Sequence, residues 1–198
     1  MITVPENYQE EKLTIDLMKA NIYALVILVP IVLLYGLPFY ILWHQENFIP
    51  DLITTIKSTS LAGVFGYIGG MFFIMLLGVV LHELIHGVTW AVFAEKGFRS
   101  IRFGVLWKAL APYCHCSEPM KVKHYFLGAI MPAILLGFIP ALYAILTNNL
   151  SILIFGGFFT MAAIGDFMII WLLRKEDPDA LVLDHPSEAG CFIYRKPN

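Results

Sequence analysis

The sequence predicts an all-α polytopic membrane protein with four transmembrane helices, a small β-hairpin and a short β-like C-terminal tail. Of its 198 residues, 59% are hydrophobic and 14% are charged, whereas an average soluble domain has about 25% charged residues. A helix needs about 20 apolar residues to cross the hydrocarbon core. Four stretches are long and apolar enough to do so: 21–43, 61–94, 125–146 and 150–173.

The placement of positive charge predicts how these four spans are oriented. Twelve of the 13 lysines and arginines lie before the first span, between the second and third, or after the fourth. Because cytoplasmic loops carry an excess of these residues, we expect both termini to be cytoplasmic. Acidic residues before the first apolar run argue against a cleavable signal peptide. The net charge of −2 gives no reason to expect a nucleic-acid partner.

The spans and their flanks carry further expectations. The stretch Leu13–Met18 is expected to form an interfacial helix before the first span. The second span is over-long, so we expect it to tilt, to break near Gly69-Gly70 or to begin outside the bilayer. Pro132 and Pro140 are expected to kink the third span, as a matter of shape alone or as an opening for water and substrate. No segment repeats, which predicts a single membrane-embedded domain over residues 1–198.

Two polar segments have the pattern of β-structure. Residues 99–116, between the second and third spans, alternate in polarity and are rich in β-forming side chains, which predicts a cytoplasmic hairpin on the membrane surface. The cytoplasmic tail, residues 174–198, contains two short predicted strands around a turn, Ala180–Leu183 and Cys191–Tyr194.

The motif His82-Glu83-Leu84-Ile85-His86 lies inside the second span. Positions i and i+4 share one face of a helix, so both imidazoles can reach one zinc ion at about 2.0–2.1 Å. Glu83 points about 100° around the helix, where it can accept a proton from a water that zinc acidifies. The alternative is a pair of core histidines with a buried glutamate. Ionisable groups inside a span are costly unless they pair or bind an ion, which favours the hydrolase-like metal site.

Asp166 is the candidate for the third ligand, since a hydrolytic zinc site has three protein ligands plus water. It lies inside the fourth span, and an intramembrane carboxylate is a functional hypothesis by default. At the rise of a helix, Asp166 is about 12 Å, and the midpoint of the two histidines about 15–18 Å, from the cytoplasmic ends of their spans. These depths match. A helix-packing hydrogen bond and a proton relay remain alternative roles for Asp166.

Several other polar residues are weaker candidates. Cys114-His115-Cys116 could suggest a second metal site, but in a strand the two cysteines share a face and His115 points away, so ordinary strand residues are favoured. His124 could donate to an oxyanion or lie at the membrane interface, and His185 is either a turn residue or folds back over the site. The three cysteines form no CxxC pair and no disulfide framework, which predicts reduced thiols.

Together these residues resemble the bacterial putative zincin peptidases, a family of integral membrane proteins. The resemblance covers about residue 70 to the C-terminus, and four features carry it: the motif through Gly87, the proline-containing segment 129–140, Gly165-Asp166, and the tail 182–194. It implies a location in the bacterial cytoplasmic membrane.

More distantly, the arrangement resembles the site-2 proteases, which cut substrates within the membrane. In that family the two motif histidines and a later aspartate bind zinc, and the glutamate is the catalytic base. The resemblance therefore implies zinc binding by His82, His86 and Asp166, with Glu83 as the base. Site-2 proteases usually carry Leu-Asp-Gly around the third ligand, whereas here Asp166 follows Ile164-Gly165, so its role is inferred from position rather than from motif.

The expected function is a zinc-dependent intramembrane or membrane-proximal endopeptidase, with one Zn²⁺ per chain and Glu83 as general base. Its partners would be the lipid bilayer and a membrane protein or peptide substrate, which the edge of the hairpin could hold extended by strand addition. Two other classes stay open. One is a non-proteolytic metal-binding membrane protein, such as a regulator, chaperone or inactive homologue. The other is a zinc hydrolase that acts on a lipid or another non-peptide bond.

Overall fold

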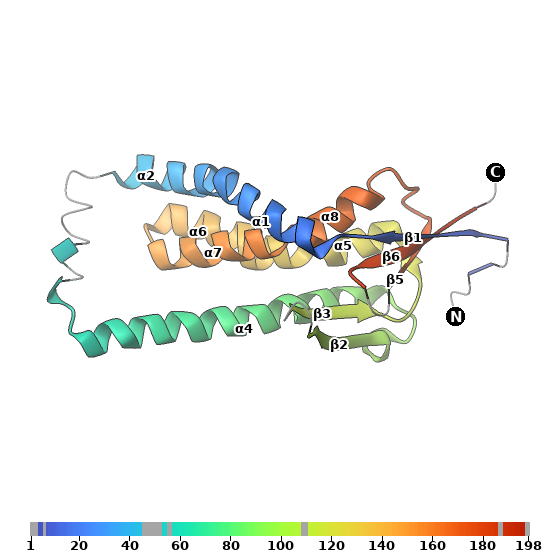
Figure 1. The fold of residues 1–198 in the computed structure, drawn as a ribbon, viewed down its shortest axis with the longest axis horizontal. Coiled ribbons are helices and arrows are strands. Elements are labelled where there is room, and N and C mark those ends of the chain that lie inside the picture. The colour runs from blue at the N-terminus through green and yellow to red at the C-terminus, as the bar shows by residue number, and fades with distance from the viewer. Residues whose placement is uncertain are drawn as a thin grey trace.

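A computed structural model of the chain describes residues 4–5, 7–44, 53–54, 57–107, 111–185 and 188–196. It shows an elongated bundle of helices with small β-sheets at one end (Figure 1). The helices are α1 (Leu17–Ile31), η1 (Val32–Gly36), α2 (Leu37–Trp43), α4 (Leu61–Phe93), η2 (Gly97–Ser100), α5 (Val122–Pro132), η3 (Ala133–Phe138), α6 (Ile139–Thr147), α7 (Leu150–Ala162) and α8 (Ile164–Leu173).

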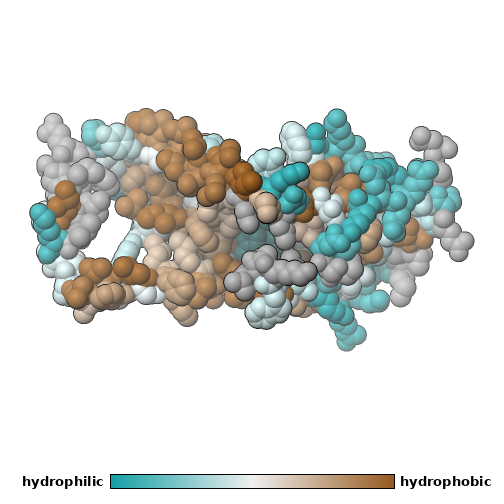
Figure 2. All heavy atoms as spheres, in the orientation of Figure 1, coloured by the Kyte–Doolittle hydropathy of each residue, from teal (hydrophilic) through white to brown (hydrophobic). Residues whose placement is uncertain are grey.

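The helices support the predicted membrane-protein class. Within the described residues, three continuous helices are long and apolar enough to span a membrane: Met18–Trp43, Leu61–Phe93 and Val122–Thr147. The predicted fourth span is instead a pair of helices, α7 and α8, which meet at a bend of 41°. Hydrophobic side chains cover the helical part, and hydrophilic ones gather over the sheets (Figure 2), as expected where helices are surrounded by lipid and sheets by water.

Helix α4 is continuous over 33 residues, so the break considered near Gly69-Gly70 is absent. Ser60 caps its first turn by accepting a hydrogen bond from the Gly63 amide at 3.2 Å. The buried positions 78, 82, 86 and 90 recur every fourth residue and form one stripe along the helix. This stripe, which includes both motif histidines, is the face that packs against the rest of the bundle.

Prolines flank the two π-helical segments of the bundle. The segment η1 lies between Pro30 and Pro38, and η3 lies between Pro132 and Pro140. Because proline has no backbone N–H and crowds the carbonyl four residues earlier, it interrupts the regular ladder, and a wider turn accommodates the change. At Pro132 and Pro140, where the sequence predicted a kink, the structure has a π-helical turn within one continuous apolar helix.

The sheets are more extensive than the sequence suggested. A hairpin pairs β2 (Ile101–Leu106) with β3 (Ala111–Cys116). A four-stranded antiparallel sheet has the order β1-β6-β5-β4, formed by β1 (Gln9–Thr14), β4 (Met120–Lys121), β5 (Leu181–Asp184) and β6 (Gly190–Arg195). The two predicted tail strands are confirmed within one residue.

The interfacial helix predicted at Leu13–Met18 is wrong. Leu13 belongs to β1 and pairs with Cys191 of β6. Helix α1 begins at Leu17, after Asp16 accepts a hydrogen bond from the Met18 amide at 2.8 Å. The partner strand lies at the opposite end of the chain, so the strand had no local signal that could separate it from a short helix.

The hairpin packs directly against the C-terminal half of α4. A side chain on Gly87 would have its Cβ 2.6 Å from the Phe103 ring, 2.9 Å from Ile101 and 3.2 Å from Cys114 Sγ. Glycine is therefore required here for the close approach of helix and strands. A buried cluster that includes Trp90, Tyr125 and Val182 joins the ends of α4 and α5 to the sheets. This packing holds the hairpin and the tail beside the motif histidines.

Candidate metal centre

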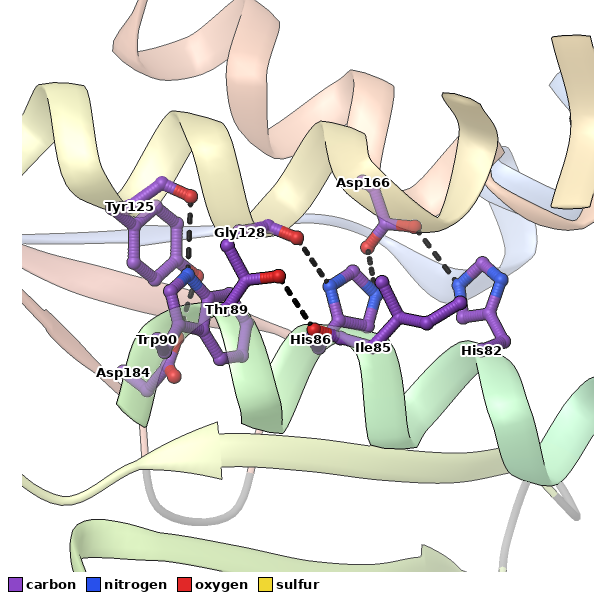
Figure 3. A network of polar contacts seen from close by, with 9 residues as sticks. All are labelled: His82, Ile85, His86, Thr89, Trp90, Tyr125, Gly128, Asp166 and Asp184. Atoms are coloured by element: carbon purple, nitrogen blue, oxygen red, sulfur yellow. Dashed lines mark hydrogen bonds and ion pairs between the residues drawn. The ribbon is translucent and has the colours of Figure 1, made fainter. Parts of the chain in front are cut away.

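Helix α4 presents both motif histidines to one carboxylate on α8. His82 Nε2 lies 3.2 Å from Asp166 Oδ2, and His86 Nε2 lies 3.3 Å from Asp166 Oδ1. One ligand atom from each of the three residues falls within 4.8 Å of the other two. Figure 3 shows Asp166 reaching toward both imidazoles. The residues predicted from spacing and depth are therefore brought together.

The orientation of His86 suits metal binding. Its Nδ1–H donates to the Gly128 carbonyl of α5 at 2.8 Å, which leaves Nε2 with a lone pair directed at the site. A second hydrogen bond of this kind fixes the tautomer and ring orientation of metal-ligating histidines. The His86 and His82 side chains are almost fully buried, and Asp166 is 24% exposed. Two imidazoles and a carboxylate are a donor set that zinc uses in hydrolytic enzymes.

Asp166 lies directly after the break between α7 and α8. Asp166 lies in the first turn of α8, just after the bend at Ala163. A new helix begins here, so its first amides lack intrahelical partners and favour a nearby negative charge. The broken helix thus supplies a favourable place for a carboxylate inside an apolar segment.

Glu83 lines the same cavity as the three clustered residues. The cavity has a volume of about 310 Å³, and its walls come from α4, α8, β3 and the tail. Glu83 is partly exposed to it, and the backbone amide of Cys114 approaches the Glu83 carboxylate. A carboxylate so placed can exchange a proton with a water in the cavity.

Aromatic residues support the centre in a way that was not predicted. The Trp90 indole stacks on His86, with ring centroids 5.1 Å apart, and on Tyr125, at 5.2 Å. Its Nε1–H donates to the Tyr125 carbonyl at 3.2 Å, and the Tyr125 hydroxyl donates to Asp184 Oδ1 at 2.5 Å (Figure 3). Trp90 follows His86 by four residues, so helical spacing could have revealed this stacking.

The weaker candidates take other places. Among the described residues, no other three His, Cys, Asp or Glu side chains converge as a metal site would require. His115 stacks on Tyr113, and Cys114 packs toward Gly87, as expected for strand residues. Burial raises the pKa of Cys116 to about 11, which keeps its thiol protonated at neutral pH.

The two remaining histidines differ in their relation to the cavity. His124 stacks on Phe93, with ring centroids 4.2 Å apart, and does not line the cavity. His185 does line it, while its ring stacks on Phe192 at 5.0 Å. The expectation that His185 could fold back over the site agrees with this position, and the oxyanion role considered for His124 receives no support.

Gly128 is predicted to be essential for the geometry around His86. A Cβ at this position would lie 2.0 Å from Trp90 Nε1, so Gly128→Ala should displace the indole that stacks on His86. We expect the free energy of unfolding to fall by about 1–3 kcal/mol and zinc affinity to weaken. Thermal unfolding in detergent and chelator competition would measure both effects. Gly69→Ala is the matched control, since its Cβ would meet no atom within 4 Å; equal effects of the two variants would contradict the prediction.

Comparison with known proteins agrees with this geometry. A family model described as Putative zincin peptidase matches residues 74–181, more than half of the chain. The matched segment contains His82, Glu83, His86 and Asp166. It also contains the β2–β3 hairpin, the span Val122–Thr147 and the bent pair of helices α7 and α8. No curated protein and no solved structure matches the chain.

Proposed function

The chain belongs to the Putative zincin peptidase family, and from this premise we propose that it is a zinc-dependent endopeptidase that cuts peptide segments within or beside the membrane. One observation carries the proposal. His82, His86 and Asp166 converge at the wall of a cavity that Glu83 also lines. Three protein ligands with room for water beside a carboxylate is the arrangement of a catalytic zinc site rather than a closed structural one.

Each residue of the centre has a distinct role in the proposed reaction. His82, His86 and Asp166 would hold one zinc ion, which when bound lowers the pKa of water toward about 7 and polarises a carbonyl. Glu83 accepts a proton from the attacking water as its oxygen bonds to the scissile carbonyl carbon. Glu83 then gives that proton to the leaving nitrogen as the carbon–nitrogen bond breaks. The reaction consumes one water for each peptide bond, Glu83 ends in its starting protonation state, and no other reactant is needed.

The outer edge of β3 supports a peptide rather than a lipid as substrate. In an antiparallel pair, the amides of alternate residues point toward the partner strand and away from it. Ser117 N–H donates to Ser100 O across the hairpin at 2.8 Å, whereas Cys116 N–H points outward. By the same alternation Cys114 N–H points outward, into the cavity wall beside Glu83. An extended peptide could pair with this edge and so present a carbonyl to the centre.

Metal removal provides the test of this function. We expect the full-length protein in proteoliposomes to cleave fluorescently labelled casein, an unfolded probe that offers extended segments. Treatment with 1,10-phenanthroline should abolish cleavage, and added Zn²⁺ should restore it. Zinc binding at one ion per chain without cleavage of casein or membrane peptides would favour the non-proteolytic class. Release of fatty acid from the lipids would favour the lipid hydrolase.

The proposed orientation places both termini and the sheets in the cytoplasm. Of the cationic residues that the structure describes, most lie at the sheet end of the molecule, in or beside the strands or at the adjoining ends of the helices, in agreement with the rule for cytoplasmic loops. A green fluorescent protein fused after Asn198 should therefore fluoresce in bacterial cells, and alkaline phosphatase fused there should stay inactive. The reverse pattern would overturn the orientation and place the centre near the outer surface.

A further inference from the structure

Asp184 is a carboxylate at the end of β5 that the proposed reaction does not use. It lines the cavity, yet it does not belong to the group of residues that could hold a metal. Its two oxygens have partners on two different elements. Oδ1 accepts from the Tyr125 hydroxyl of α5 at 2.5 Å, and Oδ2 accepts from the Cys116 amide of β3 at 2.8 Å. One side chain therefore joins the tail to both α5 and β3.

The Tyr125 contact leads to the metal centre. The Tyr125 ring stacks on Trp90, and Trp90 stacks on His86. Figure 3 shows Asp184 at one end of this row and His86 toward the other. Hydrogen bonds to an ionised group are stronger than those between neutral groups, so Asp184 restrains the Tyr125 side of the row.

The Cys116 contact leads to the proposed substrate-binding edge. Outward amides on an edge strand are free to pair with another strand, but Cys116 N–H is already taken by Asp184. Pro112, at the other end of the edge, has no N–H to offer. Between them, the outward amide of Cys114 approaches the Glu83 carboxylate, so a peptide that pairs at Cys114 would take the place of this contact. The edge that a peptide could use is thus short, and Asp184 marks its end.

Asp184 is itself held in place by the four-stranded sheet. Asp184 pairs with Cys191 in the β5–β6 ladder, and the amide of the next residue, His185, donates to Gly190 O at 3.0 Å. Strand β6 in turn pairs with β1 over six residues. Burial raises the pKa of Asp184 to about 6, so the carboxylate is ionised at neutral pH and accepts both hydrogen bonds.

We propose that Asp184 is a positioning residue: it fixes the outer edge of β3 relative to His86 and so sets the register in which an extended peptide lies across the metal centre. The inference rests on the proposed peptidase function. It differs from a purely structural role, because its loss should change how peptides bind while the metal site stays intact. It also gives the C-terminal tail a part in substrate binding.

The test compares Asp184→Ala and Asp184→Asn in the zinc-loaded full-length protein in nanodiscs. Hydrogen–deuterium exchange at the Cys116 amide should become at least about tenfold faster in Asp184→Ala, because a hydrogen bond to a charged acceptor is lost. Asn keeps an acceptor oxygen, so exchange in Asp184→Asn should stay within about threefold of wild type. Asp179→Asn is the control, since this carboxylate pairs with Lys121 and Lys123 away from the cavity. Zinc stoichiometry should be unchanged in all three variants.

The second measurement on these variants is the kinetics of cleavage of labelled casein. Asp184→Ala should raise KM by about tenfold and change kcat by less than about threefold, and Asp184→Asn should recover most of the loss. Three results would overturn the proposal: unchanged exchange at Cys116 in Asp184→Ala, equal behaviour of the Ala and Asn variants, or a fall in kcat with KM unchanged. If the wild type fails to cleave casein, the peptidase function is in doubt, whereas the exchange data still decide whether Asp184 holds the edge.

Discussion

Replacing Glu83 by glutamine is expected to slow peptide cleavage by on the order of 10³-fold, which is the scale of general acid–base catalysis. Glutamine has nearly the same shape as glutamate but cannot accept a proton at neutral pH. Glu83 lines the cavity without belonging to the group of three that could hold the metal. Zinc content should therefore remain that of the wild type, and the loss should appear in kcat rather than in KM.

The control for this variant is Glu95→Gln. Glu95 lies just after the end of α4, at Phe93, and does not line the cavity. Cleavage of labelled casein and zinc content by mass spectrometry should both match the wild type. Retained cleavage in Glu83→Gln would show that another group takes the proton. Loss of zinc in Glu83→Gln would instead mean that Glu83 helps to hold the metal.

Replacing Asp166 by asparagine is expected to weaken zinc binding by at least about 100-fold, since partners that only support a ligand already contribute about 10–100-fold. The carboxylate lies 3.2 Å from one imidazole and 3.3 Å from the other, so the three side chains could ligate one shared ion. A neutral amide of the same shape supplies neither the charge nor a comparable donor. Cleavage should fall together with zinc occupancy and should return in part at high zinc concentration.

Chelator competition on the purified protein measures this affinity, with Asp179→Asn as control for the loss of one carboxylate outside the cavity. Unchanged affinity in Asp166→Asn would assign the third-ligand role to another residue. Of the histidines His115 and His124, which the sequence left as weaker candidates for a role, His115 lines the cavity and His124 does not. A failure of this prediction would therefore direct attention to His115 first.

The sequence predicted the parts of the centre that depend on local helix geometry and on the bilayer. The i, i+4 spacing of His82 and His86 determines that their imidazoles share a face, and the structure has them on one buried stripe. The place of Asp166 in the centre could be predicted, because the ends of the spans give a common reference for depth in the membrane. The bend of 41° next to Asp166 could not be predicted, since Ala163 is no stronger a helix breaker than its neighbours.

The support around the centre depends on long-range contacts, so the sequence did not reveal it. Asp184 meets Tyr125 and Cys116, which precede it by 59 and 68 residues. Strand β1 pairs with residues near the opposite end of the chain. Neither contact leaves a periodic pattern that could be read locally. The stacking of Trp90 on His86 is the exception, because the i, i+4 spacing of the two residues indicates this contact. The sequence analysis did not use it, since tryptophans in membrane proteins also serve general packing and interfacial roles.

X-ray absorption spectroscopy at the zinc edge tests the proposed ligand set most directly. For the purified, zinc-loaded protein, we predict nitrogen and oxygen neighbours at about 2.0–2.2 Å with the multiple scattering of two imidazoles, and one zinc ion per chain. The imidazole signal should belong to His82 and His86 and should fall when either is replaced. A sulfur shell at about 2.3 Å would contradict the account, because it would place the metal on Cys114 and Cys116 instead.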